Sequence, residues 1–189
     1  MKKLILMLML GLGLISCQDK QKIEYLPSNS IYNLSSEWTN QDGKNMHFSD
    51  MIGKNMIVVM IYTTCKTACP LLVADMKKVK SQIPEDLLKE TNLVLVSIDP
   101  ETDTPEKLNS FAKTNKMYGE PWIFLRSNED DTKEFANILS MKYKKISPIE
   151  FSHSNIISIF NKKGEMMSQE EGAGINAEKV VAELKKIKN

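Results

Sequence analysis

Arginine is almost absent from this sequence, and histidine and cysteine are scarce. Arg126 is the one arginine among 25 basic residues, which face 24 acidic residues for a formal net charge of +1. Nucleic-acid binding needs a basic field and draws on the forked guanidinium of arginine. The composition therefore argues against DNA or RNA as a partner. With two histidines and three cysteines, any metal site has few candidate ligands.

No apolar run is long enough to cross a membrane as a helix. The longest, Leu4 to Ile15, covers twelve residues, whereas a spanning helix needs about 20. Lys2 and Lys3 precede it, which is typical of a secretory signal peptide. The run ends at Leu14-Ile15-Ser16-Cys17, which resembles the lipobox of bacterial lipoproteins. The alternative is an ordinary signal peptide with an incidental cysteine.

These features predict three segments. Residues 1–16 are a lipoprotein signal peptide, residues 17–30 are a tether lipidated at Cys17, and residues 31–189 form a single domain. The protein is then expected in the cell envelope, as a lipoprotein anchored to a membrane and facing the periplasm. Cys65 and Cys69 are left as the only other cysteines, in a compartment that permits disulfides.

The domain alternates between strand and helix patterns. Unbroken apolar runs of strand length predict strands buried on both faces of a sheet, and apolar residues at helical spacing predict the helices between them. A hairpin around the turn Gln41-Asp42-Gly43 precedes the first long strand. This alternation predicts an α/β domain with a mostly parallel sheet flanked by helices on both faces. Strands are expected at 56–62, 93–98, 122–125 and 156–160, and helices at 72–83, 105–112, 128–141 and 176–187.

Cys65 and Cys69 follow the strand at 56–62 and lead into a helix. Open α/β sheets place ligand sites at this edge. Their spacing predicts both sulfurs on one face of the first helical turn, where the helix dipole favours thiolates. The pair can then bind a metal, exchange disulfides with a partner, or form an inert disulfide. The inert disulfide would restrain the unfolded chain little, because its loop is short.

Two soft sulfur ligands suit Cu(I), which accepts few ligands, better than zinc, which takes four. His153 lies in a predicted loop before the strand at 156–160, at the same end of the sheet, and can add a nitrogen ligand. His47 is expected to be an ordinary surface residue. The methionines Met56, Met60 and Met76 fall at core spacing and are expected to pack rather than to bind metal.

Three stretches resemble the SCO/SenC family: the Cys-x3-Cys-Pro motif within 61–70, the stretch 96–108 containing SIDPETDTP, and His153-Ser154 before the last buried strand. The resemblance runs from about residue 31 to residue 187. It implies a thioredoxin-like fold and copper, as Cu(I) with Cu(II) left open, held by Cys65, Cys69 and His153. It also implies a role in assembling the copper centre of cytochrome c oxidase, with the copper-bearing subunit or another cuproprotein as partner.

A second function stays open, that of a membrane-anchored thiol–disulfide oxidoreductase. Cys65, expected to be the more exposed cysteine, would attack a partner disulfide, and Cys69 would resolve the mixed disulfide. Lys66 would lower the pKa of the thiols and speed this exchange. A peroxidase fits less well, because residues 61–64 lack the proline that precedes the reactive cysteine of peroxiredoxins. Loss of His153 should weaken metal binding but barely affect thiol exchange.

Overall fold

The computed structural model describes residues 25–65, 68–147, 150–172 and 174–187, with side chains throughout except at Ala68 and Cys69. The predicted signal peptide and the lipidation site at Cys17 lie outside these ranges. None of the helices in the described ranges combines the length and the apolar character needed to span a bilayer. In chain order the elements are η1 (Ile31–Asn33), β1 (Trp38–Asn40), β2 (Asn45–Met46), η2 (Phe48–Met51), β3 (Asn55–Ile61), α1 (Ala68–Gln82), α2 (Glu85–Leu88), β4 (Thr91–Ser97), α3 (Pro105–Thr114), β5 (Trp122–Arg126), α4 (Glu129–Ile138), β6 (Tyr143–Ser147), β7 (Glu150–His153), β8 (Ile156–Phe160), β9 (Met166–Glu171) and α5 (Ala177–Lys186).

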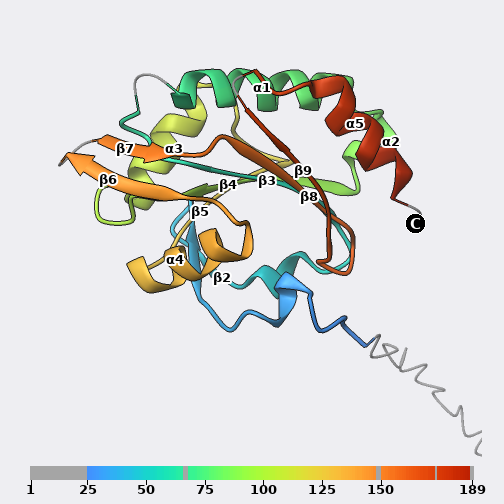
Figure 1. The fold of residues 1–189 in the computed structure, drawn as a ribbon, viewed down its shortest axis with the longest axis horizontal. Helices are drawn as coiled ribbons and strands as arrows, with labels where there is room; N and C mark the ends of the chain where they lie inside the picture. Colours follow the sequence, from blue (N-terminus) through green and yellow to red (C-terminus); the bar gives the residue numbers. More distant parts are fainter. Residues whose placement is uncertain (1–24, 66–67, 148–149, 173, 188–189) are drawn as a thin grey trace, which may run out of the picture.

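The described strands form a seven-stranded sheet in the order β2-β1-β5-β4-β3-β8-β9, with β6 and β7 paired separately as a hairpin. The three central strands β3, β4 and β5 run parallel, and the outer strands join them antiparallel. Helices α1 and α5 lie side by side on one face, and α4 lies on the other (Figure 1). The predicted α/β architecture is confirmed, with parallel pairing confined to the centre of the sheet.

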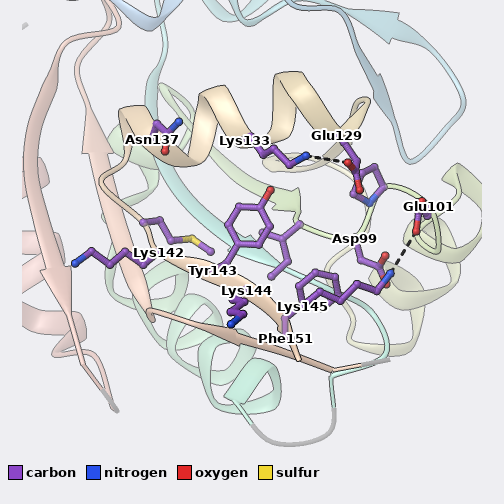
Figure 2. Close-up of a pocket in the computed structure, with 13 residues that line it drawn as sticks. Asp99, Glu101, Glu129, Lys133, Asn137, Lys142, Tyr143, Lys144, Lys145 and Phe151 are labelled. Atoms are coloured by element: carbon purple, nitrogen blue, oxygen red, sulfur yellow. Dashed lines mark hydrogen bonds and ion pairs between the residues drawn. The ribbon is translucent and has the colours of Figure 1, made fainter. Parts of the chain in front are cut away.

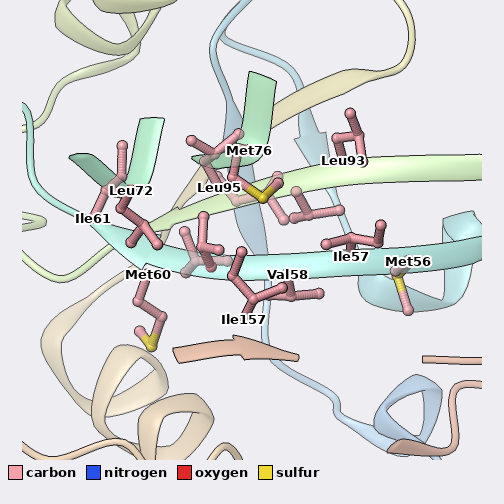
Figure 3. Packing of buried hydrophobic residues seen from close by; sticks show 14 of the residues in the cluster. Met56, Ile57, Val58, Met60, Ile61, Leu72, Met76, Leu93, Leu95 and Ile157 are labelled. Carbon is pink, nitrogen blue, oxygen red and sulfur yellow. The ribbon is translucent and has the colours of Figure 1, made fainter. Parts of the chain in front are cut away.

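Strand β3 is the centre of the core, and all seven of its residues are buried. Leu72 and Met76 of α1 pack against one face of the sheet, while Met60 of β3 points to the opposite face (Figure 3). Met56, Met60 and Met76 are at most 1% exposed. Their predicted role as core packing is therefore confirmed.

Side-chain caps fix where the helices after β4, β5 and β9 begin. Thr104, Asn128 and Asn176 each accept a hydrogen bond from the backbone N–H three residues later. Pro105 follows Thr104 as the first helical residue, where its missing N–H costs nothing. Such caps satisfy N–H groups that have no partner inside the helix. The helix starts predicted at 105, 128 and 176 are confirmed to within one residue.

The segment around His153 was predicted to be a loop, and this prediction is wrong. Residues Glu150–His153 form strand β7, which pairs antiparallel with β6, so that His153 lies opposite Tyr143. The hairpin stands apart from the main sheet, near the end of the sheet where β3 ends at Ile61 (Figure 1). Its strands are short and contain no buried residue, so their sequence carries little of the apolar signal that marks a buried strand.

Candidate metal centre

Cys65 lies in a turn that follows β3. Its backbone N–H donates to the carbonyl oxygen of Tyr62 at 3.3 Å. Cys65 is 9% exposed; that it is the more exposed of the two cysteines stays a prediction, because the side chain of Cys69 lies outside the described residues. The turn folds its side chain back toward the core instead of presenting it to solvent.

Cys69 lies in the first turn of α1, a helix of 15 residues. Helix α1 begins at Ala68, so the prediction that both cysteines share the first helical turn is wrong for Cys65. Pro70 is tolerated in this first turn because its missing N–H has no partner there in any helix. The side chain of Cys69 and the intervening Lys66 and Thr67 lie outside the described residues.

The buried carboxylate of Asp103 anchors the turn before Cys65. Asp103 is 0% exposed and accepts hydrogen bonds from the Thr63 N–H at 3.2 Å, the Thr63 hydroxyl at 2.5 Å and the Ser97 hydroxyl at 2.6 Å. Burial raises the pKa of this carboxyl, although the same donors oppose the shift, and the nearby charge of Asp99 adds to it. Asp103 thereby ties the ends of β3 and β4 together beneath the cysteine-bearing turn.

His153 has a buried ring nitrogen for which the described residues offer no hydrogen-bond partner. Its Nδ1 lies 3.1 Å from the carbonyl oxygen of Ser154. A carbonyl oxygen only accepts, so Nδ1 must carry the hydrogen and the neutral ring keeps its lone pair on Nε2. Nε2 is shielded from solvent and has no hydrogen-bond partner among the described residues. A buried polar atom without a hydrogen-bond partner lowers the stability of the fold by about 1–3 kcal/mol, and a bound metal would remove that penalty.

Tyr62 connects the cysteine-bearing turn with the histidine-bearing hairpin. Its ring centroid lies 5.1 Å from that of Phe151 and 5.8 Å from that of His153, with the histidine ring nearly perpendicular to it. Its hydroxyl accepts a hydrogen bond from the Phe151 N–H at 3.4 Å. The same residue thus contacts Cys65 through its backbone and His153 through its side chain, although these two positions lie 88 residues apart in the sequence.

A cavity of about 570 Å³ lies between α4, the loop that follows β4 and the β6–β7 hairpin (Figure 2). Tyr143, Lys145 and Phe151 line it from the hairpin. Two ion pairs cross or border it, Lys133–Glu129 at 2.8 Å and Lys145–Glu101 at 3.3 Å. Part of the inner face of the hairpin therefore borders open space instead of packed side chains.

Sequence reasoning identified the candidate ligands but missed two residues that hold their segments in place, Tyr62 and Asp103. Tyr62 was assigned only to the end of a buried strand. Asp103 enters the sequence analysis only as part of the SIDPETDTP stretch, and its anchoring role depends on contacts with Thr63 and Ser97. Among the side chains that the structure describes, no three His, Cys, Asp or Glu residues cluster closely enough to hold a metal ion; the predicted set includes Cys69, whose side chain is outside that description.

The mixed sheet with helices on both faces and a cysteine-bearing turn after a central strand define a thioredoxin-like α/β protein, as the family resemblance implied. The model of the SCO1/SenC family matches residues 28–189. The chain therefore belongs to this family.

Three relatives illustrate the match. The SCO1 protein homolog of Bacillus subtilis is 31% identical over 98 residues, which make up 51% of this chain and 50% of that protein; this chain thus spans about half the length of that curated relative. A SCO1/SenC family lipoprotein from Bacillus anthracis has a TM-score of 0.74 and 25% identity, covering 83% of this chain and 95% of the other. Copper-bound ScoI from Arabidopsis thaliana has a TM-score of 0.67 and 20% identity, covering 80% of this chain and 96% of the other.

Proposed function

We propose that this chain binds Cu(I) through the thiolates of Cys65 and Cys69 and through Nε2 of His153, and passes it to an acceptor protein. The observation that carries the proposal is the buried Nε2 of His153, which has its lone pair available and no hydrogen-bond partner among the described residues. Metal-binding histidines hold their other ring nitrogen in a hydrogen bond of the kind that Nδ1 makes with Ser154.

The chemistry of the donor set supports Cu(I). Thiolates are soft ligands that select Cu(I), and an imidazole nitrogen completes a site of low coordination number. Cys69 lies in the first turn of α1, where the helix dipole favours the thiolate form. Copper is cargo in this scheme, because it moves by exchange of ligands between two proteins. No electron is transferred in this exchange, and the thiols of both proteins stay in the same oxidation state.

The acceptor that fits the family is the copper-bearing subunit of cytochrome c oxidase or another extracytoplasmic cuproprotein. Membership of the SCO1/SenC family supports this assignment, as does the copper bound to Arabidopsis ScoI. The lipobox-like sequence ending at Cys17 supports an anchored position in the cell envelope, and the Bacillus anthracis relative is itself a lipoprotein. An anchor would keep the protein at the membrane surface, where an oxidase exposes its extracytoplasmic domains.

The test is a Cu(I) titration of the reduced full-length protein in detergent, against a competing chelator. We expect one tight equivalent, and a loss of affinity of about 10-fold or more in His153→Ala. His47→Ala is the matched control, because the Nδ1 of His47 contacts the carbonyl oxygen of Ser36 in the N-terminal part of the fold. It should leave the affinity unchanged.

Two results would contradict the proposal: the absence of competitive Cu(I) binding, or binding that is indifferent to His153. Either would favour thiol–disulfide exchange, and the reduction potential of the Cys65 and Cys69 pair would be measured next. Thiol–disulfide exchange gives no role to the available lone pair on the buried Nε2 of His153, and we therefore favour copper binding.

A further inference from the structure

We propose that Tyr62 is a positioning residue that holds His153 in the orientation required for binding copper. The inference rests on the proposed function, because it assigns Tyr62 a role at the same site. It concerns a residue that is not a ligand itself. Tyr62 follows the last residue of β3 and is 4% exposed, so its ring is fixed to the most buried strand of the molecule.

The first argument is the weak attachment of the hairpin that carries His153. Strands β6 and β7 pair only with each other in the described part of the chain. Part of their inner face borders the cavity beside α4 (Figure 2). A histidine on such an element can take several orientations unless a further contact selects one.

The second argument is that the ring contacts between hairpin and sheet converge on Tyr62. Within the described residues, both aromatic contacts that join the hairpin to β3 involve its ring, one with Phe151 and one with His153. The Phe151 N–H also donates to its hydroxyl. The ion pair between Lys145 and Glu101 also joins the hairpin to the loop after β4, but its two side chains are 41% and 67% exposed, and it is expected to contribute little.

The third argument is the geometry at the imidazole. The histidine ring meets the tyrosine ring at 82°, an edge-to-face arrangement that aromatic pairs favour. The hydrogen bond from Nδ1 to Ser154 fixes which nitrogen keeps the lone pair, and Tyr62 limits rotation of the ring about its side-chain bonds. A ligand that is already ordered loses less conformational freedom on binding the metal, so affinity rises without a new bond to it.

A double-mutant cycle on Cu(I) affinity tests the proposal, with the reduced full-length protein in detergent and a competing chelator. Tyr62→Leu removes the ring but keeps an apolar side chain, and should weaken Cu(I) binding about 3- to 10-fold. Tyr62→Phe keeps the ring and should stay within about 2-fold of wild type, because the hydroxyl bond at 3.4 Å is long. In the His153→Ala background, Tyr62→Leu should cause no further loss.

The matched control is Phe111→Leu, which removes a similar edge-to-face contact, with Phe124 at 6.1 Å and 70°, in a different part of the fold. It should lower the melting temperature of the apoprotein without changing Cu(I) affinity. If Tyr62→Leu does not fold, Phe151→Leu removes the ring contact that holds Tyr62 against the hairpin, and should weaken Cu(I) binding through His153 in the same non-additive way.

The outcomes separate this proposal from the proposed function. If His153→Ala weakens binding but Tyr62→Leu adds its full effect in that background, Tyr62 acts by another route and the positioning role is refuted, while the ligand set stands. Unchanged affinity in both Tyr62→Leu and Phe151→Leu also refutes the role. If His153→Ala itself leaves affinity unchanged, the ligand set fails, and the positioning role fails with it.

Discussion

The carboxylate of Asp103 gives the most direct test of how the cysteine-bearing turn is held. Three donors converge on it, the N–H and hydroxyl of Thr63 and the hydroxyl of Ser97. Asp103→Asn keeps the shape but replaces one oxygen with an NH2 group that cannot accept, so at least one donor loses its acceptor. An unsatisfied buried donor costs about 1–3 kcal/mol, and we expect the free energy of unfolding to fall by about 2 kcal/mol.

The same substitution should alter the pH dependence of stability. Burial raises the pKa of Asp103 above its ordinary value of 3.8, so the folded state binds this proton more tightly than the unfolded state does. The resulting stabilisation is fully present below the unfolded-state pKa and is lost as pH rises through the folded-state pKa. The stability difference between wild type and Asp103→Asn should therefore be larger at about pH 3.5 than at about pH 7.

Urea denaturation of the apoprotein, followed by tryptophan fluorescence at a series of pH values, measures this difference. Ser97→Ala is a matched variant: it removes a donor that lowers the pKa of Asp103, so the loss of stability should extend to higher pH. A wild-type advantage over Asp103→Asn that grows from about pH 3.5 to about pH 7 would refute the reasoning. It would mean that the hydrogen-bond donors lower the pKa of Asp103 more than burial raises it, so that folding favours the carboxylate over the acid.

Two further predictions concern single atoms. Gly164 has φ +76°, and a Cβ there would lie 2.6 Å from Ser30 Oγ and 2.8 Å from Tyr32 Cδ2. In thermal melts, Gly164→Ala should lower the free energy of unfolding by more than about 1 kcal/mol. Gly43→Ala should lower it less, because Gly43 has φ +75° but open space around the added atom. Equal losses would contradict the steric argument. In ¹⁵N NMR spectra of the reduced apoprotein, neutral His153 should be the Nδ1–H tautomer, since that nitrogen faces a carbonyl oxygen. The opposite tautomer would contradict the assignment of the free lone pair to Nε2.

Most of the fold could be predicted because its central elements carry strong local signals. The unbroken apolar run of β3 leaves no polar face, which is the pattern of a strand buried on both sides. The start of α3 could be predicted from Thr104 and Pro105, because capping depends on residues that adjoin in sequence. In these segments a few neighbouring residues decide the local structure, so the sequence alone was sufficient.

The supports of the candidate site could not be predicted, because they depend on contacts between distant segments. Strand β7 is four residues long, with alternate residues exposed, and such a weak pattern is easily taken for a loop. The contact of Tyr62 with His153 joins positions 91 residues apart, and no local pattern encodes it. The spacing of Cys65 from Cys69 predicts that Cys65 lies in the helix. Instead, the hydrogen bond from its N–H to the Tyr62 carbonyl and the hydrogen bond from Thr63 to Asp103 hold it in the turn before the helix.

The two described ligand residues of the proposed site are held in physically different ways. The turn at Cys65 is tied to Asp103 by hydrogen bonds inside the core, and breaking them leaves buried polar groups unsatisfied. His153 lies on a hairpin that borders a cavity and is held by a local hydrogen bond to Ser154 and by an edge-to-face contact with Tyr62; breaking the aromatic contact leaves no such penalty. Substitutions on the cysteine side should therefore appear mainly as lost stability of the apoprotein. Those on the histidine side should appear mainly as lost affinity for copper, because the core remains packed while the ligand loses its preferred orientation.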